Sequence, residues 1–135
     1  MVYLDRAFDL LQQLAMQGAA DTPALAYLAE FYRDRRDDAH ALPLYERVWR
    51  SDPSQYAAVA ALGAYRIQRG DLEGAVDFWN RALAINPAMP LVRINLANAL
   101  LRLGRSRDAR ITLERALGFN PALKEARELL NRLDK

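Results

Sequence analysis

The chain has 135 residues, of which 52% are hydrophobic, and a formal net charge of +2, so it is long enough to bury the core of one domain. It contains no cysteine, which excludes disulfides, thiolate metal sites and a cysteine nucleophile. The longest uncharged apolar stretch covers residues 56–65, whereas a membrane-spanning helix needs about 20 residues. We therefore expect a buried helix there and no membrane insertion. The N-terminus lacks the pattern of an export signal, and the sequence leaves the compartment open.

Apolar residues recur at steps of three and four along most of the chain, which is typical of amphipathic helices. Glycine, proline and short polar runs separate these segments. Thr22 is a candidate N-cap, with Pro23 at the first helical position. Gly70 and Gly104 mark turns inside helix pairs, but Arg36 occupies the equivalent place in the first pair, so we expect that turn to be looser or differently shaped. We expect helices near 4–17, 23–35, 39–51, 55–69, 72–85, 90–103, 106–118 and 123–134.

The helix pairs repeat with a period of about 34 residues, a length typical of stacked helical hairpins. Pro53, Pro87 and Pro121 are evenly spaced by this period, and each follows an Asp or an Asn. The same shift aligns small and bulky residues in two columns, which are Ala7, Ala41, Ala75 and Ala109, and Leu11, Tyr45, Trp79 and Leu113. Such a period predicts a stack of helical hairpins, which more readily offers a surface for another macromolecule than an active site.

These columns resemble the tetratricopeptide repeat, a helix-turn-helix unit of about 34 residues. The first helices match it at Leu28-Ala29, Leu62-Gly63 and Leu96-Ala97, and the second helices match it in the two columns above. The resemblance implies an all-α fold, a right-handed superhelical solenoid of antiparallel helix pairs. We interpret residues 1–135 as a single domain, in which 1–21 are the second helix of a partial repeat, 22–55, 56–89 and 90–123 are full repeats, and 124–135 are a capping helix.

The resemblance also implies a concave groove, lined by the first helix of each pair, in which a protein or peptide partner lies. Asn95 and Asn98 would each offer a donor and an acceptor to a peptide backbone. The alanines in the middle would leave room for a bulky or extended segment. The alternative, that the alanines only pack helices and the asparagines only face water, stays open. The projected groove residues are Tyr27, Glu30, Arg33, Asp34, Ala57, Ala60, Ala61, Ala64, Gln68, Leu91, Ile94, Asn95, Asn98 and Arg102.

Some members of the family hold an acidic peptide C-terminus in a carboxylate clamp of Lys, Arg and Asn. Only one of the corresponding positions fits here, and Glu30 has the wrong sign. We therefore do not expect this clamp. The corresponding residues are Ala26, Glu30, Ala61, Leu91 and Asn95.

The sequence offers little material for catalysis. His40 is the only histidine, so no cluster of histidines can hold a metal, and spacing supports no Ser-His-Asp arrangement. No glycine-rich phosphate loop occurs. We therefore expect a chain that is not an enzyme and that needs no cofactor or metal.

Aromatic and basic residues could suggest nucleic-acid binding, but their positions favour packing and solvation. Tyr45 and Trp79 lie in a core column, and only Phe78 falls outside the columns, where it could be exposed. A ladder of Arg47, Arg81 and Arg115 on the second helices adjoins glutamates, which favours a solvated face of mixed charge. We expect no nucleic-acid partner.

Residues 1–21 fit only the second half of a repeat. Either the chain is cut from a longer array, or this helix meets something outside the chain through Leu4, Phe8 and Leu11. The second case would make the chain a homo-oligomer, as a dimer or an end-to-end array. Net charge differs between residues 1–55, at −3, and residues 56–135, at +5, which could orient a partner or a second copy. A third alternative is an adaptor segment of a larger protein.

Overall fold

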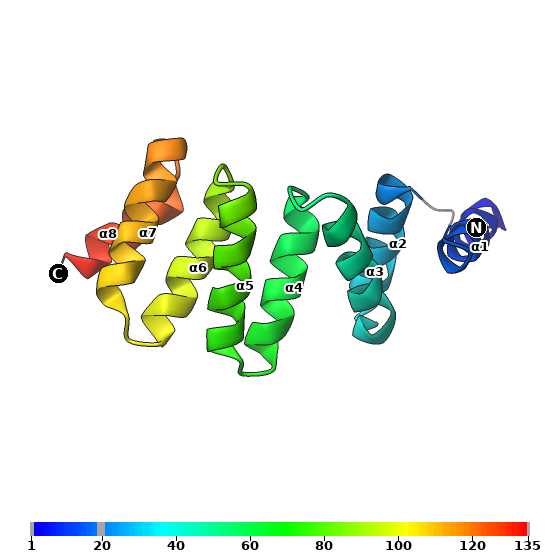
Figure 1. The fold of residues 1–135 in the computed structure, drawn as a ribbon, viewed down its shortest axis with the longest axis horizontal. Coiled ribbons are helices and arrows are strands. Elements are labelled where there is room, and N and C mark those ends of the chain that lie inside the picture. Colours follow the sequence, from blue (N-terminus) through cyan, green and yellow to red (C-terminus); the bar gives the residue numbers. More distant parts are fainter. Residues whose placement is uncertain (1, 19–20, 135) are drawn as a thin grey trace. The chain divides into compact units, whose positions relative to one another are not determined.

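The computed structural model describes the backbone of residues 2–18 and 21–134, and the side chains of its first helix from Arg6 onward. Every regular element in this part of the chain is an α-helix, which confirms the predicted all-α class (Figure 1). The predicted helix boundaries agree with the observed ones within two residues. The helices are α1 (Val2–Met16), α2 (Thr22–Asp34), α3 (Asp38–Ser51), α4 (Tyr56–Gln68), α5 (Leu72–Ile85), α6 (Pro90–Arg102), α7 (Ser106–Phe119) and α8 (Lys124–Leu133).

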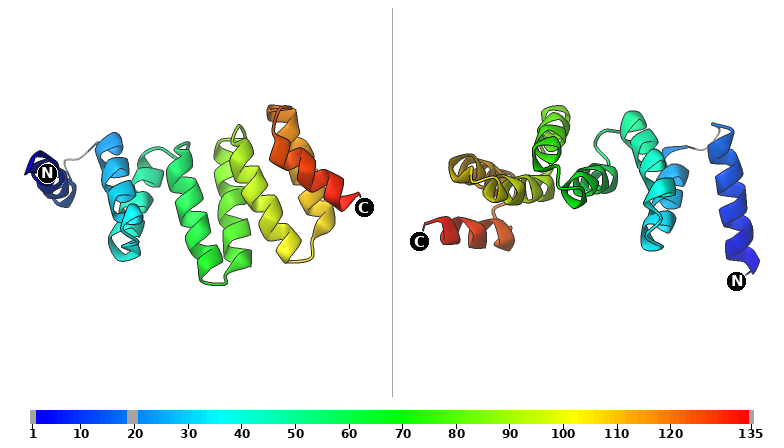
Figure 2. Two further views of the ribbon diagram at one scale, coloured as in Figure 1. Left: turned by 180° about the vertical axis from the view of Figure 1, so that it is seen from behind. Right: turned by 90° about the horizontal axis from the view of Figure 1, so that it is seen from below.

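The helices belong to two compact units, Met1–Leu62 and Gly63–Lys135. In the first unit, α2 packs along α3, and α1 contacts α2. In the second unit, α6 lies between α5 and α7, and α8 packs against α7 (Figure 2). The division falls within α4, inside the second predicted repeat. That the three repeats fold as one domain stays a prediction.

Aspartates begin three of the helices. Asp21 accepts a hydrogen bond from Ala24 N at 3.0 Å, Asp37 from His40 N at 3.3 Å, and Asp71 from Gly74 N at 2.8 Å. Each bond satisfies one of the amides that a first helical turn leaves without a partner. Thr22 is therefore the first helical residue and not the cap, because the neighbouring carboxylate takes that role.

The turn inside the first helix pair has the same geometry as the other two. Arg36 adopts φ 58°, close to the 77° of Gly70 and the 78° of Gly104. The amide that follows bonds back to the preceding helix in all three pairs, from Asp37 to Tyr32 O at 2.9 Å in the first. The expectation of a looser or different turn at Arg36 is wrong, because these backbone bonds hold an arginine in a conformation that favours glycine.

Each proline that closes a repeat follows an acceptor side chain that orders the turn. Oδ1 of Asp52, Asn86 and Asn120 accepts a hydrogen bond from the amide two residues later, at 3.1 Å in every case. Such Asx turns explain why Asp or Asn recurs at this position with the period of the repeat.

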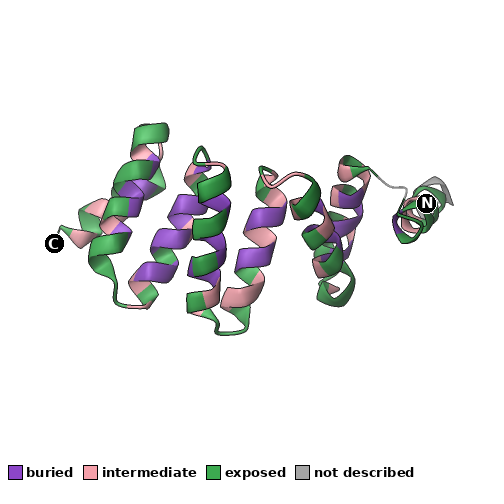
Figure 3. Cartoon of the chain, viewed as in Figure 1, coloured by how far each residue is buried: buried purple, intermediate pink, exposed green. Residues whose placement is uncertain are grey.

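In the three full repeats the repeat columns form part of the core, and buried residues follow one face of most helices (Figure 3). In α1 the column residues Ala7 and Leu11 are exposed and half-buried, respectively. Tyr45, Trp79 and Leu113 are all at most 3% exposed. Phe78 is also 3% exposed, so the expectation that it could be exposed is wrong. Arg66 covers it, with the guanidinium 5.1 Å from the ring centroid and a hydrogen bond from Nη1 to Gly74 O at 3.0 Å. Arg66 thus places its guanidinium over an aromatic ring, where the cation is attracted by the ring's π-electrons.

Candidate functional site

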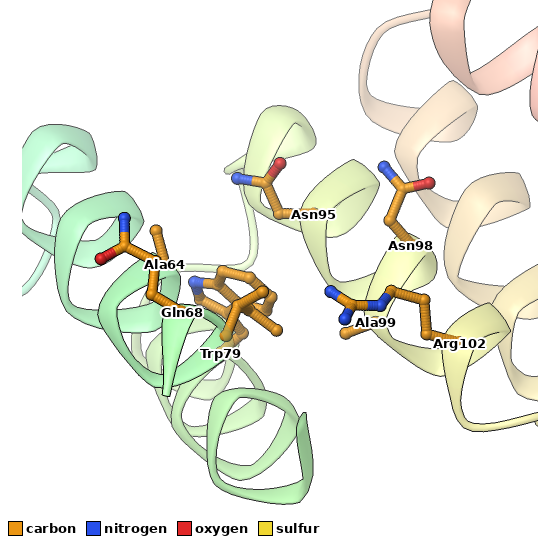
Figure 4. A pocket seen from close by; sticks show the side chains of 8 residues that line it. Ala64, Gln68, Trp79, Asn95, Asn98, Ala99 and Arg102 are labelled. Atoms are coloured by element: carbon orange, nitrogen blue, oxygen red, sulfur yellow. The ribbon is translucent and has the colours of Figure 1, made fainter. Parts of the chain in front are cut away.

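A pocket of about 300 Å³ opens between α4 and α6 in the second unit, and its floor is apolar (Figure 4). Trp79 and Ala99, both nearly buried, and the half-buried Ile67 form this floor. Polar side chains from both helices surround it. The complete lining is Ala64, Ile67, Gln68, Trp79, Asn95, Asn98, Ala99 and Arg102.

The polar rim consists of three amides and one guanidinium. Gln68, Asn98 and Arg102 are exposed and Asn95 is half-buried. Each amide carries two donor hydrogens and an acceptor oxygen, which is the complement of a peptide main chain. Asn95 and Asn98 lie on one face of α6 because residues three apart are neighbours on a helix. The arrangement can bind a polar chain segment above an apolar floor.

The position of Trp79 at the pocket floor depends on a glycine, Gly63, which has no side chain. A Cβ atom on Gly63 of α4 would lie 2.5 Å from Cζ2 of Trp79 and closer still to Nε1 and Cε2. The indole therefore packs directly on the backbone of α4, where only glycine leaves room for it. The corresponding pairs in the other repeats are Ala29 with Tyr45 and Ala97 with Leu113, so the largest member of the bulky column faces the smallest partner.

The structure brings together five of the predicted groove residues, namely Ala64, Gln68, Asn95, Asn98 and Arg102. Sequence reasoning missed Ile67, Trp79 and Ala99 as lining residues. It placed Trp79 in the core, and the side chain is both buried and part of the pocket floor. The glycine opposite the largest aromatic of the column is the signal that could have identified it.

Two predicted groove residues of α6 do not line the pocket. Leu91 is 47% exposed and lies outside it. Ile94 is 2% exposed, which leaves a ligand no surface to contact, so its assignment to the groove is corrected. The physical reason is that α6 has neighbours on both sides, and a helix enclosed in this way buries most of its circumference.

The remaining groove candidates belong to the first unit, and none of them lines the pocket. Tyr27 is 50% exposed, Glu30, Arg33 and Asp34 are also exposed, and Ala57, Ala60 and Ala61 are half-buried. Their role in binding stays a prediction.

Within the first unit, α1 packs against α2 through residues of the side that was predicted to self-associate. The ring of Phe8 lies against that of Phe31, with centroids 4.1 Å apart and planes tilted by 31°, and meets Tyr32 edge-on at 5.6 Å. Leu11 is half-buried, and the side chain of Leu4 lies outside the described residues. The exposed apolar residues of α1 are different ones, Leu10 at 60%, Leu14 at 41% and Met16 at 83%.

Polar contacts complete this attachment. Gln12 Nε2 donates to the Tyr32 hydroxyl at 3.0 Å, and Arg47 Nη1 donates to the carbonyl of Ala15 at 2.8 Å. The second bond adds to the one that the Ala15 carbonyl accepts from Gly18 N at 3.1 Å, and it places a cation at the last turn of α1, where positive charge is favoured. Arg47 therefore has a structural role, which differs from the solvated face expected of its column.

The only histidine of the chain pairs with a neighbouring aspartate. His40 Nδ1 lies 2.7 Å from Oδ2 of Asp37, and its ring stacks on Tyr32. No three His, Cys, Asp or Glu side chains in the described part of the chain come together in a way that could hold a metal ion. No helix of that part is long and apolar enough to cross a membrane.

The tetratricopeptide repeat model matches residues 66–133, half of the chain. Solved structures share the fold. MamA superimposes with a TM-score of 0.75 at 17% identity, covering 93% of this chain and 74% of MamA. The first TPR of Spaghetti (RPAP3), bound to the HSP90 peptide SRMEEVD, gives 0.71 at 18% identity, covering 84% and 92%. An O-GlcNAc transferase of Thermobaculum terrenum gives 0.67 at 24% identity, covering 83% of this chain and 22% of the transferase.

Helical hairpins that recur with a constant period, and a pocket between the first helices of two neighbouring hairpins, define a repeat scaffold of the kind that commonly mediates protein-protein interaction. The chain belongs to the tetratricopeptide repeat family.

Proposed function

We propose that the chain is a non-catalytic scaffold that binds a peptide segment of a partner protein in the pocket between α4 and α6. One observation carries this proposal: three amides and an arginine surround a floor of buried and half-buried apolar side chains. A peptide main chain needs donors and acceptors, and its side chains gain free energy when apolar area leaves water. The peptide complex of the RPAP3 neighbour supports the use of this fold for peptides.

The partner is expected to differ from the HSP90 peptide of that neighbour. Of the positions that correspond to a carboxylate clamp, only Asn95 carries a suitable side chain, and Glu30 would repel a carboxylate. The pocket offers a different set of groups, in which amides outnumber charges.

Selection from a displayed library of random peptides, followed by fluorescence titration of the selected peptides, tests the proposal. The chain has two tryptophans, so a Trp49→Phe variant reports from Trp79 alone. Because the indole forms the floor of the pocket, a peptide that enters should shift the emission of Trp79.

Ala64→Arg should abolish this shift, because Ala64 is exposed and lines the pocket. The matched control is Ala84→Arg, the same substitution at an exposed position of α5 outside the lining. If both variants bind the selected peptides like the parent, the pocket is not the binding site and the proposal is wrong.

Self-association is a second candidate function, favoured by the exposed Leu10, Leu14 and Met16 of α1. A contiguous exposed apolar patch is a feature of protein interaction sites. Sedimentation up to about 100 μM decides this, since a chain still monomeric there has no dissociation constant in the range of stable dimers.

A further inference from the structure

The pocket between α4 and α6 contains one charge, and that charge has no partner among the described residues. Arg102 is the only charged residue among those that line it. It makes no hydrogen bond or ion pair with the described part of the chain. Six other arginines of the second unit do make such contacts, namely Arg66, Arg69, Arg93, Arg105, Arg110 and Arg127. Its side chain extends toward the middle of the pocket (Figure 4). The guanidinium is therefore available to a ligand.

The apolar floor determines which kind of side chain can lie beside an anionic group that binds Arg102. Ala64 and Ala99 are small, and with Ile67 and Trp79 they leave a volume of about 300 Å³ above the indole. A large apolar side chain that fills this volume displaces water from around Arg102. Because the attraction between charges grows as the dielectric constant falls, the same event strengthens the attraction between the guanidinium and a neighbouring carboxylate.

The amides limit the shape of the ligand. Gln68 on α4 and Asn95 and Asn98 on α6 lie on both sides of the floor (Figure 4). A main chain that runs between them keeps its polar groups bonded while one side chain points down to Trp79. The neighbouring residue then lies at the level of the rim, where Arg102 is.

On the basis of the proposed function, we infer that the ligand is an internal peptide segment in which a large apolar residue adjoins Asp or Glu. The apolar side chain occupies the floor over Trp79, and the side-chain carboxylate pairs with Arg102. No C-terminal carboxylate is required, because the acid is supplied by a side chain.

Binding to arrayed short peptides, acetylated and amidated so that no terminal carboxylate is present, tests this inference. Each peptide has a central leucine or phenylalanine flanked by Glu, Gln or Lys. Glu peptides should bind the full chain at least tenfold more tightly than the Gln peptides, which have the same shape without the charge. Arg102→Glu should transfer the preference to the Lys peptides.

The control for charge is Arg107→Glu, which changes the net charge equally at an exposed residue of α7 outside the pocket. It should leave the preference for Glu peptides unchanged. A preference that Arg107→Glu removes as fully as Arg102→Glu would arise from general attraction and would overturn the inference.

Three further outcomes show whether the inference fails alone or together with the function on which it rests. If Glu and Gln peptides bind equally and Ala64→Arg abolishes both, the pocket binds peptides but the inferred acid is wrong. If no arrayed peptide binds, both statements fail. If instead the chain self-associates and Arg102→Glu abolishes that association, the occupant is a second copy and the inference is likewise overturned.

Discussion

Replacing Gly63 with alanine tests whether the close packing of Trp79 on α4 determines the stability of the second unit. The added Cβ would lie 2.5 Å from Cζ2 of Trp79, whereas ordinary contact begins at 3.4 Å. The indole is 3% exposed, so the ring cannot turn into solvent without losing its burial. Either the ring or the backbone of α4 has to move.

Two effects of this substitution oppose each other. Alanine in place of glycine inside a helix gains roughly 0.5–1 kcal/mol, and overpacking a core costs about 1–3 kcal/mol. The overlap involves three atoms of a rigid ring, so we take the upper part of the second range. Gly63→Ala should therefore lower the free energy of unfolding by about 2 kcal/mol.

Gly118→Ala is the matched control. Gly118 lies in α7, and a Cβ there meets no atom within 4 Å, so only the favourable helix term applies. A second control uses the chain's own repeats: in a Trp79→Leu background, Gly63→Ala recreates the pair that Ala97 and Leu113 form in the third repeat. The alanine should then be neutral or stabilising.

Urea denaturation followed by circular dichroism measures all four variants. The reasoning is refuted if Gly63→Ala and Gly118→Ala have the same effect, or if Gly63→Ala costs as much in the Trp79→Leu background as in the parent. The second result would show that the cost arises elsewhere in α4, because a double-mutant cycle isolates the interaction between two side chains.

Three further substitutions have defined outcomes. Arg36→Gly should raise the free energy of unfolding by about 1 kcal/mol in urea denaturation, because left-handed φ angles cost other residues roughly that amount; an unchanged midpoint would contradict this. The Tyr45 hydroxyl is buried without a hydrogen-bond partner among the described residues, and burial raises its pKa above 10.0. The neutral form is thus favoured in the folded state, and stability should fall as pH rises above about 10; Tyr45→Phe should unfold less readily there, and identical pH profiles would refute this. Arg47→Met should accelerate amide hydrogen exchange in α1 but not in α5–α8, because it removes the 2.8 Å bond to Ala15 O; equal exchange in parent and variant would show that the bond does not hold the helix.

Much of the fold was predictable because it arises from local patterns. Apolar periodicity located the helices, and the recurring Asn-Pro and Asp-Pro pairs located the closing turns, where Oδ1 orders the backbone. Columns of equal period identified Tyr45, Trp79 and Leu113 as core. These features depend on residues close together in the sequence or on the repeat itself.

The predictions that were wrong concern contacts that the alignment of repeats in columns does not describe. Ile94 is buried because α6 has a helix on each side, and Phe78 because Arg66 covers it. At Arg36 the backbone bonds of the turn outweigh the preference for glycine. In the pocket, the polar rim followed from the resemblance to the tetratricopeptide repeat, but the floor required knowing that Trp79 lies across Gly63. Such a contact depends on distances between helices, which residue types alone do not give.

The closing turns have a consequence for how arrays of this kind change length. Asn86 and Asn120 each accept a hydrogen bond from the amide two residues later. Arg93 and Arg127 donate to the carbonyls of Pro87 and Pro121, six residues earlier in the chain, at 3.1 and 2.8 Å. A junction whose bonds are made by neighbouring residues is copied whole whenever a gene segment one repeat long is duplicated. Recombination at these turns can therefore add or delete a hairpin without inventing a new connection, so the number of hairpins can evolve separately from the side chains that recognise a ligand.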